Sequence, residues 1–269
     1  MQRNRCKWLI PLGFLILSGG MAGAAPLQMH RAVYDLSLGR TEAASDIAGI
    51  DGRMVTEWRG GPSCGGYTSL QRVVTRVTGL DDAYMSNDIR LSYFETLDGR
   101  EFSYTRTEYT NGEMSDRDEG MATRGADGSI SLLRDGGARR DLPANVLFPV
   151  QYHHALIDRA ERGERVFELV MFDGTEERES PTTIFVSKPP EDGEDAMPEA
   201  KGAVALRGIS HWPVRIGYFD AENGEGLPNF EMGMMVFANG IATSMTLDYI
   251  DVEIRARLKE LVIFEDGSC

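Results

Sequence analysis

Most of the chain beyond its first 25 residues consists of short runs in which apolar and polar residues alternate, and glycine-rich turns separate these runs. Alternation with a period of two places the apolar side chains on one face of a strand, so the pattern predicts antiparallel β-sheet. The runs that show it are residues 30–38, 66–77, 89–97, 101–109, 129–134, 165–172, 177–186 and 201–211. We therefore expect a mainly β protein with many strands.

The clearest hairpin surrounds Asn239-Gly240, the dipeptide that most favours a two-residue turn between antiparallel strands. It joins residues 229–238 to residues 241–249. Pairing outward from the turn produces an almost wholly apolar face, in which Ala238, Val236, Met234, Met232 and Phe230 lie opposite Ile241, Thr243, Met245, Leu247 and Tyr249. Flexible thioethers suit either an ordinary core or a wall that adapts to an apolar guest. An ordinary core is the favoured interpretation.

One segment, residues 148–162, breaks the β pattern and predicts a helix. Pro149 suits the first helical position, apolar residues recur at helical spacing, and Gly163 suits the end. We expect this helix to cover one end or the mouth of the sheet. The spacing in residues 252–264 would also permit a helix, but a strand-like or irregular tail is favoured there. The acidic, proline-containing stretch 187–200 predicts a surface loop.

The first residues have the pattern of a secretory signal. Three basic residues precede an apolar run, 8–17, that is too short to span a bilayer, and Ala22-Gly23-Ala24 fits the small-x-small cleavage rule. We expect export and removal of a signal peptide, residues 1–24, by cleavage near Ala24 or Ala25. The alternative is an uncleaved N-terminal anchor. Cys6 precedes the apolar run and would leave with the signal.

Two cysteines then remain, Cys64 and Cys269, and the second is the last residue of the chain. Thiols that reach an oxidising compartment usually pair as disulfides. Cys64 lies in a glycine-rich loop that is flexible enough to receive a distant partner. We therefore expect a Cys64–Cys269 disulfide. A redox-active role is disfavoured, because the chain contains no Cys-x-x-Cys motif and nothing beside either cysteine would stabilise a thiolate.

Charge excludes one class of partner. The 269-residue chain has a formal charge of −14, which becomes −17 when the three basic residues of the signal are removed. Nucleic acid is therefore a poor partner, and lipid phosphates are approachable only locally or through divalent cations. Residues 25–269 are expected to form a single β domain, because all-β domains often reach this length.

Few residues offer a recognisable catalytic or metal chemistry. His153-His154 invites a metal interpretation, but adjacent helical residues point about 100° apart, so packing or capping roles are favoured. Ser210-His211 is only a dipeptide, without a nucleophile motif around it. The facing carboxylates of Glu231 and Asp248 would suit a cation, although solvent screening is preferred as the explanation. We predict no catalytic residue, no metal and no cofactor, and the ligand-binding residues stay unknown.

Several short motifs together resemble the EipB family of periplasmic cell-envelope integrity proteins. They are His30-Arg31-Ala32-Val33-Tyr34-Asp35-Leu36, Gly52-Arg53-Met54, Cys64-Gly65-Gly66-Tyr67, Leu147-Phe148-Pro149, Trp212-Pro213-Val214, Asn239-Gly240 and the terminal Cys269. The resemblance covers essentially all of the chain after the signal. It implies a Gram-negative periplasmic protein, a β-spiral or open barrel, a disulfide that maps onto Cys64 and Cys269, and a role in envelope integrity without catalysis.

These observations favour a non-enzymatic periplasmic β-spiral that binds an apolar ligand, such as a lipid, or an envelope protein partner, in or beside a curved sheet. The alternative is an envelope hydrolase or transferase with an unrecognised site. An apolar, methionine-lined concavity would favour a carrier, and a polar cluster in the concavity would favour an enzyme. A filled core would favour a structural or protein-docking role.

Overall fold

The computed structural model describes residues 27–43, 45–188, 198–220, 226–249, 251–265 and 269, so the expected signal and most of the 187–200 loop lie outside the described residues. The strands are β1 (His30–Thr41), β2 (Ile47–Gly61), β3 (Gly66–Gly79), β4 (Tyr84–Thr96), β5 (Glu101–Thr110), β6 (Glu113–Arg124), β7 (Ile130–Arg134), β8 (Arg139–Leu142), β9 (Val146–Leu147), β10 (Val166–Met171), β11 (Ser180–Val186), β12 (His211–Tyr218), β13 (Phe230–Phe237), β14 (Ala242–Asp248) and β15 (Val252–Ile263). The helices are α1 (Pro149–Glu161) and three short 3-10 turns, η1 (Pro62–Cys64), η2 (Asp135–Gly137) and η3 (Ala203–Leu206).

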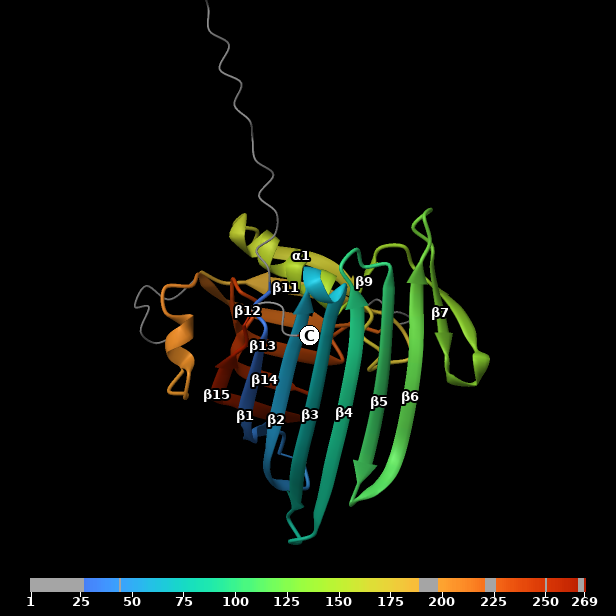
Figure 1. Ribbon diagram of the computed structural model, residues 1–269. Coiled ribbons are helices and arrows are strands. Elements are labelled where there is room, and N and C mark those ends of the chain that lie inside the picture. Colours follow the sequence, from blue (N-terminus) through green and yellow to red (C-terminus); the bar gives the residue numbers. More distant parts are fainter. Residues whose placement is uncertain (1–26, 44, 189–197, 221–225, 250, 266–268) are drawn as a thin grey trace, which may run out of the picture.

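All fifteen strands belong to one sheet, which curves round into a barrel-like wall (Figure 1). The order is β8-β7-β6-β5-β4-β3-β2-β1-β15-β14-β13-β12-β11-β10-β9, so the first and last strands of the chain pair in the middle. Every ladder is antiparallel except the one between β9 and β10. The sheet has two free edges, β8 and β9. The expected mainly β spiral or open barrel is confirmed.

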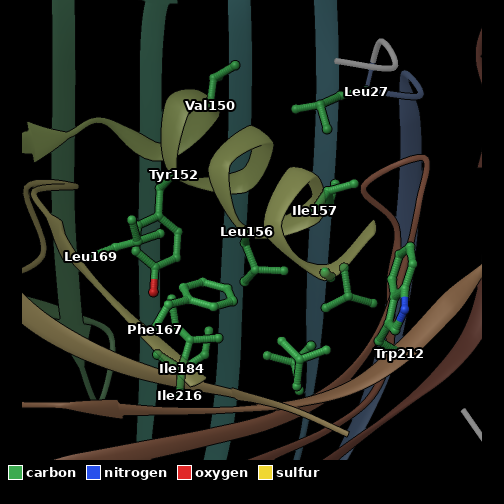
Figure 2. Packing of buried hydrophobic residues seen from close by; sticks show 14 of the residues in the cluster. Leu27, Val150, Tyr152, Leu156, Ile157, Phe167, Leu169, Ile184, Trp212 and Ile216 are labelled. Atoms are coloured by element: carbon green, nitrogen blue, oxygen red, sulfur yellow. The ribbon is translucent and has the colours of Figure 1, made fainter. Parts of the chain in front are cut away.

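The α-helix α1 closes one end of this wall, as the sequence predicted. Pro149 is the first residue of α1, and Gly163 follows its end with a φ of +81°, a left-handed conformation that glycine adopts without strain. Buried residues of α1 pack on side chains from β10, β11 and β12 (Figure 2). Tyr152 of the helix also hydrogen-bonds through its hydroxyl to Thr182 of β11 at 2.9 Å. The helix is therefore attached to the inner face of the sheet.

Three clusters of buried side chains fill the interior. The first lies under α1 and includes Val150, Leu156 and Trp212. The second joins β1 and β15 to the β13–β14 hairpin. The third contains stacked aromatic rings, among them Phe102 and Phe148 with centroids 4.9 Å apart. Met245 is buried in the second cluster, and Met234 and Met235 pack against it, so the methionines of the hairpin contribute to a core.

The hairpin at Asn239-Gly240 is present, but its predicted register holds only far from the turn. Met232 pairs with Leu247 as expected, whereas Val236 pairs with Ala242 instead of Thr243. A register shift between Gly233 and Met235 accounts for the difference, and Ser244, on the opposite strand, has a φ of +46° there. The tail from residue 252 forms the regular strand β15, so its helix-compatible spacing is overridden by pairing with β1.

The strand prediction was wrong for residues 201–211 and incomplete elsewhere. Residues 201–211 form an isolated bridge at Lys201, then η3, and only His211 begins a strand. Gly202 and Gly208 adopt left-handed conformations, with φ of +84° and +77°, which interrupt extended backbone. The strands β2, β6, β8, β9 and nearly all of β12 were not among the predicted runs. In β6, charged residues occupy both faces and hide the alternation.

The free edges of the sheet approach each other through side chains. The loop between β10 and β11 lies against the third cluster, where a Cβ on Gly174 would be 2.3 Å from the ring of Tyr104. The hydroxyl of Tyr104 donates to Asp118 at 3.0 Å, and Arg134 pairs with the same carboxylate at 2.7 Å. Arg140 of the edge strand β8 forms an ion pair with Glu179. Close packing on Gly174 and this polar network hold the two ends of the sheet together.

We expect Gly174→Ala to lower the free energy of unfolding by about 3 kcal/mol, because it adds overpacking to left-handed backbone strain. Gly112→Ala is the matched control, since Gly112 has a φ of +87° but no atom within 4 Å of its Cβ position. Gly112→Ala should lower the free energy of unfolding by only about 1 kcal/mol, because it adds left-handed backbone strain without overpacking. Urea unfolding of both variants measures the difference, and equal losses would contradict a packed closure at Gly174.

Candidate functional site

The wall of the sheet is interrupted beside β15. This strand pairs with β14 only from Glu253 to Ala256. Further along β15, Lys201 takes the place of a neighbouring strand: its N–H donates to the Lys259 carbonyl at 3.0 Å, and the Leu261 N–H donates to the Lys201 carbonyl at 2.8 Å. Gly202 is required at this contact, because a Cβ there would be 2.0 Å from the Leu261 oxygen. The segment 198–210 therefore borders β15 beyond the end of its ladder with β14.

This segment lines an open hollow of about 1280 Å³. Its lining mixes apolar and polar groups: Val204, Leu206, Ile209 and Trp212 lie beside Glu199, Arg207, Ser210 and His211. Leu206 is fully buried against the second cluster, whereas Val204 is 65% exposed. Small-molecule sites are likewise concave and combine apolar surface with placed polar groups. The hollow is the candidate ligand site, and sequence reasoning assigned its residues to a strand.

His211 brings an unused polar atom to this site. Its Nδ1 lies 3.1 Å from the Ile209 carbonyl, which only accepts, so Nδ1 carries the proton. Nε2 is buried and has no hydrogen-bond partner among the described residues. The Oγ1 of Thr243 is also buried and without such a partner. The ring of His211 lies 5.0 Å from that of Phe237. Neither ring nitrogen is hydrogen-bonded to Ser210 among the described residues.

The closed end of the sheet holds the predicted cysteines. Cys64 ends η1, and a disulfide joins it to Cys269, 205 positions later in sequence, with the two Cα atoms 5.7 Å apart. The C-terminal segment is held further by Phe264, whose ring lies 4.1 Å below the guanidinium of Arg59. Its carbonyl accepts a hydrogen bond from the Gln28 side chain at 3.3 Å. The disulfide thus ties the end of the last strand to the β2–β3 loop.

A buried carboxylate fixes the start of α1. Phe148, the residue before the helix, has no side chain that could cap it, and Glu95 of β4 supplies the cap instead. The Glu95 carboxylate accepts the N–H groups of Val150 at 2.7 Å and Gln151 at 3.2 Å. Burial raises the pKa of Glu95 to about 7, although both hydrogen bonds and Arg124 act to lower it. The helix position therefore depends on a group that titrates near neutrality.

The predicted histidines pack near the same helix. His153 lies with its Nδ1 3.0 Å from the Pro149 carbonyl, and its ring is 5.2 Å from that of Trp58. His30 has its Nδ1 2.7 Å from the Gln28 carbonyl. Burial lowers the pKa of His30, His153 and His154. Within the described ranges, no group of three histidine, cysteine or acidic residues is placed to hold a metal ion.

The facing carboxylates of the hairpin are neutralised by arginines. Glu231 and Asp248 are register partners, as predicted. Arg215 pairs with Glu231 at 2.9 Å, and Arg40 pairs with Asp248 at 2.9 Å. From sequence, solvent screening was the preferred explanation for the facing carboxylates, and this was wrong. Each carboxylate is paired with an arginine from another strand.

Across the part of the chain that the structure describes, no helix has the length and apolar character needed to cross a membrane.

The fold defines this chain as a β-barrel-like protein with a hollow beside an interrupted wall. The EipB-like family model matches residues 21–265, and the chain belongs to this family. It is 33% identical to the cell envelope integrity protein EipB of Brucella abortus (strain 2308) over 262 residues, which cover 93% of this chain and 91% of that protein. It is also similar to the crystal structure of a beta-barrel-like protein of a domain of unknown function from Brucella abortus. That likeness has a TM-score of 0.79 and 32% identity, and it covers 90% of this chain and 100% of the other.

Proposed function

We propose that this protein supports the integrity of the cell envelope from the periplasm, as a non-enzymatic binding protein. Three observations support the proposal: the name of its Brucella relative, the signal-like N-terminus, and a disulfide that suits an oxidising compartment. The single observation that carries the binding role is the hollow lined by residues of the segment 198–212, whose exposed Val204 offers apolar surface.

The ligand proposed for this hollow is an apolar molecule with one polar group, such as a lipid chain. Val204, Ile209 and Trp212 supply apolar surface. The unpartnered Nε2 of His211 is an acceptor that a hydroxyl or amide of the ligand could satisfy after a small rearrangement. The interior of the sheet is packed with side chains, so the ligand is placed beside the sheet and not inside it.

An apolar side chain of an envelope protein would use the same hollow, and the packed interior favours this second candidate. The enzyme alternative would need a catalytic cluster among the polar lining residues. Those residues are Glu199, Arg207, Ser210 and His211, and they form no hydrogen bond with one another among the described residues: the Nδ1 of His211 is bonded to the Ile209 carbonyl. A bound apolar molecule therefore remains the proposal to test first.

We expect Val204→Trp to weaken binding of the fluorescent probe N-phenyl-1-naphthylamine on the order of tenfold, or about 1.4 kcal/mol, because the indole fills the hollow. Val166→Trp is the matched control, since both valines are exposed, at 65% and 61%, and Val166 lies outside the hollow. Titration of each protein with the probe measures the change. Equal binding by both variants, or no binding by the wild type, would refute a ligand site here and favour the protein-docking role.

A further inference from the structure

The outer face of the sheet carries a row of arginines across neighbouring strands. Arg72 of β3 pairs directly with Arg90 of β4, Arg90 pairs with Thr107 of β5, and Thr107 pairs with Arg117 of β6. Adjacent strands lie about 4.8 Å apart, and like charges placed directly opposite each other are unfavourable. The apolar–polar alternation of a strand requires only a polar residue at these positions. In this acidic protein, several neighbouring positions are arginines.

A single carboxylate serves two of these arginines. Asp88 accepts from Arg72 at 2.9 and 2.8 Å, and from Arg90 at 2.7 Å. The two guanidinium groups lower the pKa of Asp88 to about 2, so it stays ionised. Both arginines are well exposed, at 57% and 49% of their side-chain surface, whereas Asp88 is only 18% exposed. The surface that solvent meets is consequently cationic.

The same face is basic over a wider area. We call it the arginine face and define it by the outward positions of β15, β1, β2, β3 and β4. Its basic residues outnumber its acidic ones: they are Arg31, Arg53, Arg59, Arg72, Arg76, Arg90, Arg255, Arg257 and Lys259, against Asp35, Asp51, Glu57, Asp88, Glu253 and Glu260. The whole chain has a formal charge of −14, so the acidic excess lies elsewhere on the molecule.

Exposed apolar and aromatic groups are interspersed with these charges. Along β3, Leu70 and Val74 flank Arg72 and are 47% and 36% exposed. The guanidinium of Arg76 lies 4.4 Å from the ring of Tyr84, and that of Arg90 lies 4.6 Å from the ring of Tyr109. Apolar, aromatic and guanidinium groups together suit the headgroup region of a bilayer, where phosphates and the ends of acyl chains meet.

We propose that the arginine face docks the protein on an anionic membrane surface through lipid phosphates. Guanidinium groups bind phosphate oxygens, and each basic residue near an anionic bilayer contributes about 1 kcal/mol. Screening limits this attraction to about 8 Å at physiological salt, so the acidic remainder of the molecule does not cancel it. Repulsion of that remainder orients the sheet with this face toward the lipid. Because β15 borders both surfaces, docking places the hollow near the bilayer.

Co-sedimentation with vesicles tests the docking surface. Wild-type protein should sediment with vesicles of phosphatidylcholine containing phosphatidylglycerol, should not sediment with phosphatidylcholine alone, and should be released by salt. The double variant R72Q/R90Q should bind roughly thirtyfold more weakly, the equivalent of two lost basic contacts. The matched control R139Q/R165Q removes two exposed arginines that lie off this face and should bind like the wild type.

A third variant is expected to strengthen vesicle binding. Asp88→Asn leaves both guanidinium groups without their carboxylate and should strengthen vesicle binding, whereas damage to the fold would weaken it. Circular dichroism confirms that each variant is folded. The proposal is overturned by equal losses in R72Q/R90Q and its control, by no binding of the wild type, or by binding that needs Mg²⁺ and survives R72Q/R90Q. Probe binding in the hollow should be unchanged in R72Q/R90Q, which keeps this test separate from that of the ligand.

Discussion

Replacing Cys269 with serine should lower the free energy of unfolding by up to about 5 kcal/mol under oxidising conditions, which is the loop-entropy limit for so large a ring. The disulfide joins residues 205 positions apart, so it closes most of the unfolded chain into one loop. Cys269 is itself exposed, and its side chain contributes little packing. The loss should therefore come from the unfolded state and appear as a lower urea midpoint.

Reductant supplies the control for this experiment. Reduced wild type should unfold at the midpoint of the variant, and Cys64→Ser and the double variant should match Cys269→Ser, because each removes the same cross-link. Reductant should not change any of the three variants. A variant as stable as the oxidised wild type would show that Phe264, stacked under Arg59, holds the chain end without the disulfide.

Glu95→Gln should remove a large part of the pH dependence of stability between pH 5 and pH 8. The pKa of Glu95 is raised from its ordinary 4.5 to about 7 in the folded protein. The folded protein thus favours the protonated acid. The contribution of Glu95 to the free energy of unfolding is fully present below pH 4.5 and is lost as the pH rises through 7. The total loss is roughly 3 kcal/mol, because a difference of one between the folded and unfolded pKa values corresponds to about 1.36 kcal/mol. Urea unfolding at several pH values measures it.

The neighbouring histidines act in the opposite direction and must be separated from Glu95. Burial lowers the pKa of His30, His153 and His154, so their contribution is present above pH 6.5 and is lost as the pH falls. The informative quantity is therefore the difference between wild type and Glu95→Gln at each pH. Asp98→Asn is the control, because this exposed acid is already ionised across the same range. A difference that does not change from pH 5 to pH 8 would contradict the assignment to Glu95.

The elements that were predictable from sequence have local signals. The helix is marked by Pro149 and Gly163, and the hairpin is marked by Asn239-Gly240. The expected disulfide needed only two cysteines and an export signal. The segment 198–210 could not be predicted, because its alternation resembles a strand and its position depends on contacts with β15, more than fifty residues later.

Glu95 could not be assigned either, since its partners lie 55 and 56 residues away. A signal was nevertheless present: Phe148 precedes a helix without a capping side chain, so the free N–H groups required an acceptor from another element. The arginine face was hidden for a similar reason. A row of residues across several strands can be recognised only when the register between the strands is known. The negative net charge alone suggests a cationic partner and not an anionic one.

The pairing of β1 with β15 also has a consequence for the order of assembly. His30 pairs with Ile263, so the central ladder of the sheet joins the earliest and the latest strands of the chain. As the chain becomes available to fold from its N-terminus, β1 to β8 can pair with their sequence neighbours, but the far side of β1 stays unpaired until the final strand arrives. Contacts between such distant residues form slowly. An unpaired strand edge of this kind is open to association with other chains, so β1 is exposed to that hazard until residues 252–263 are in place.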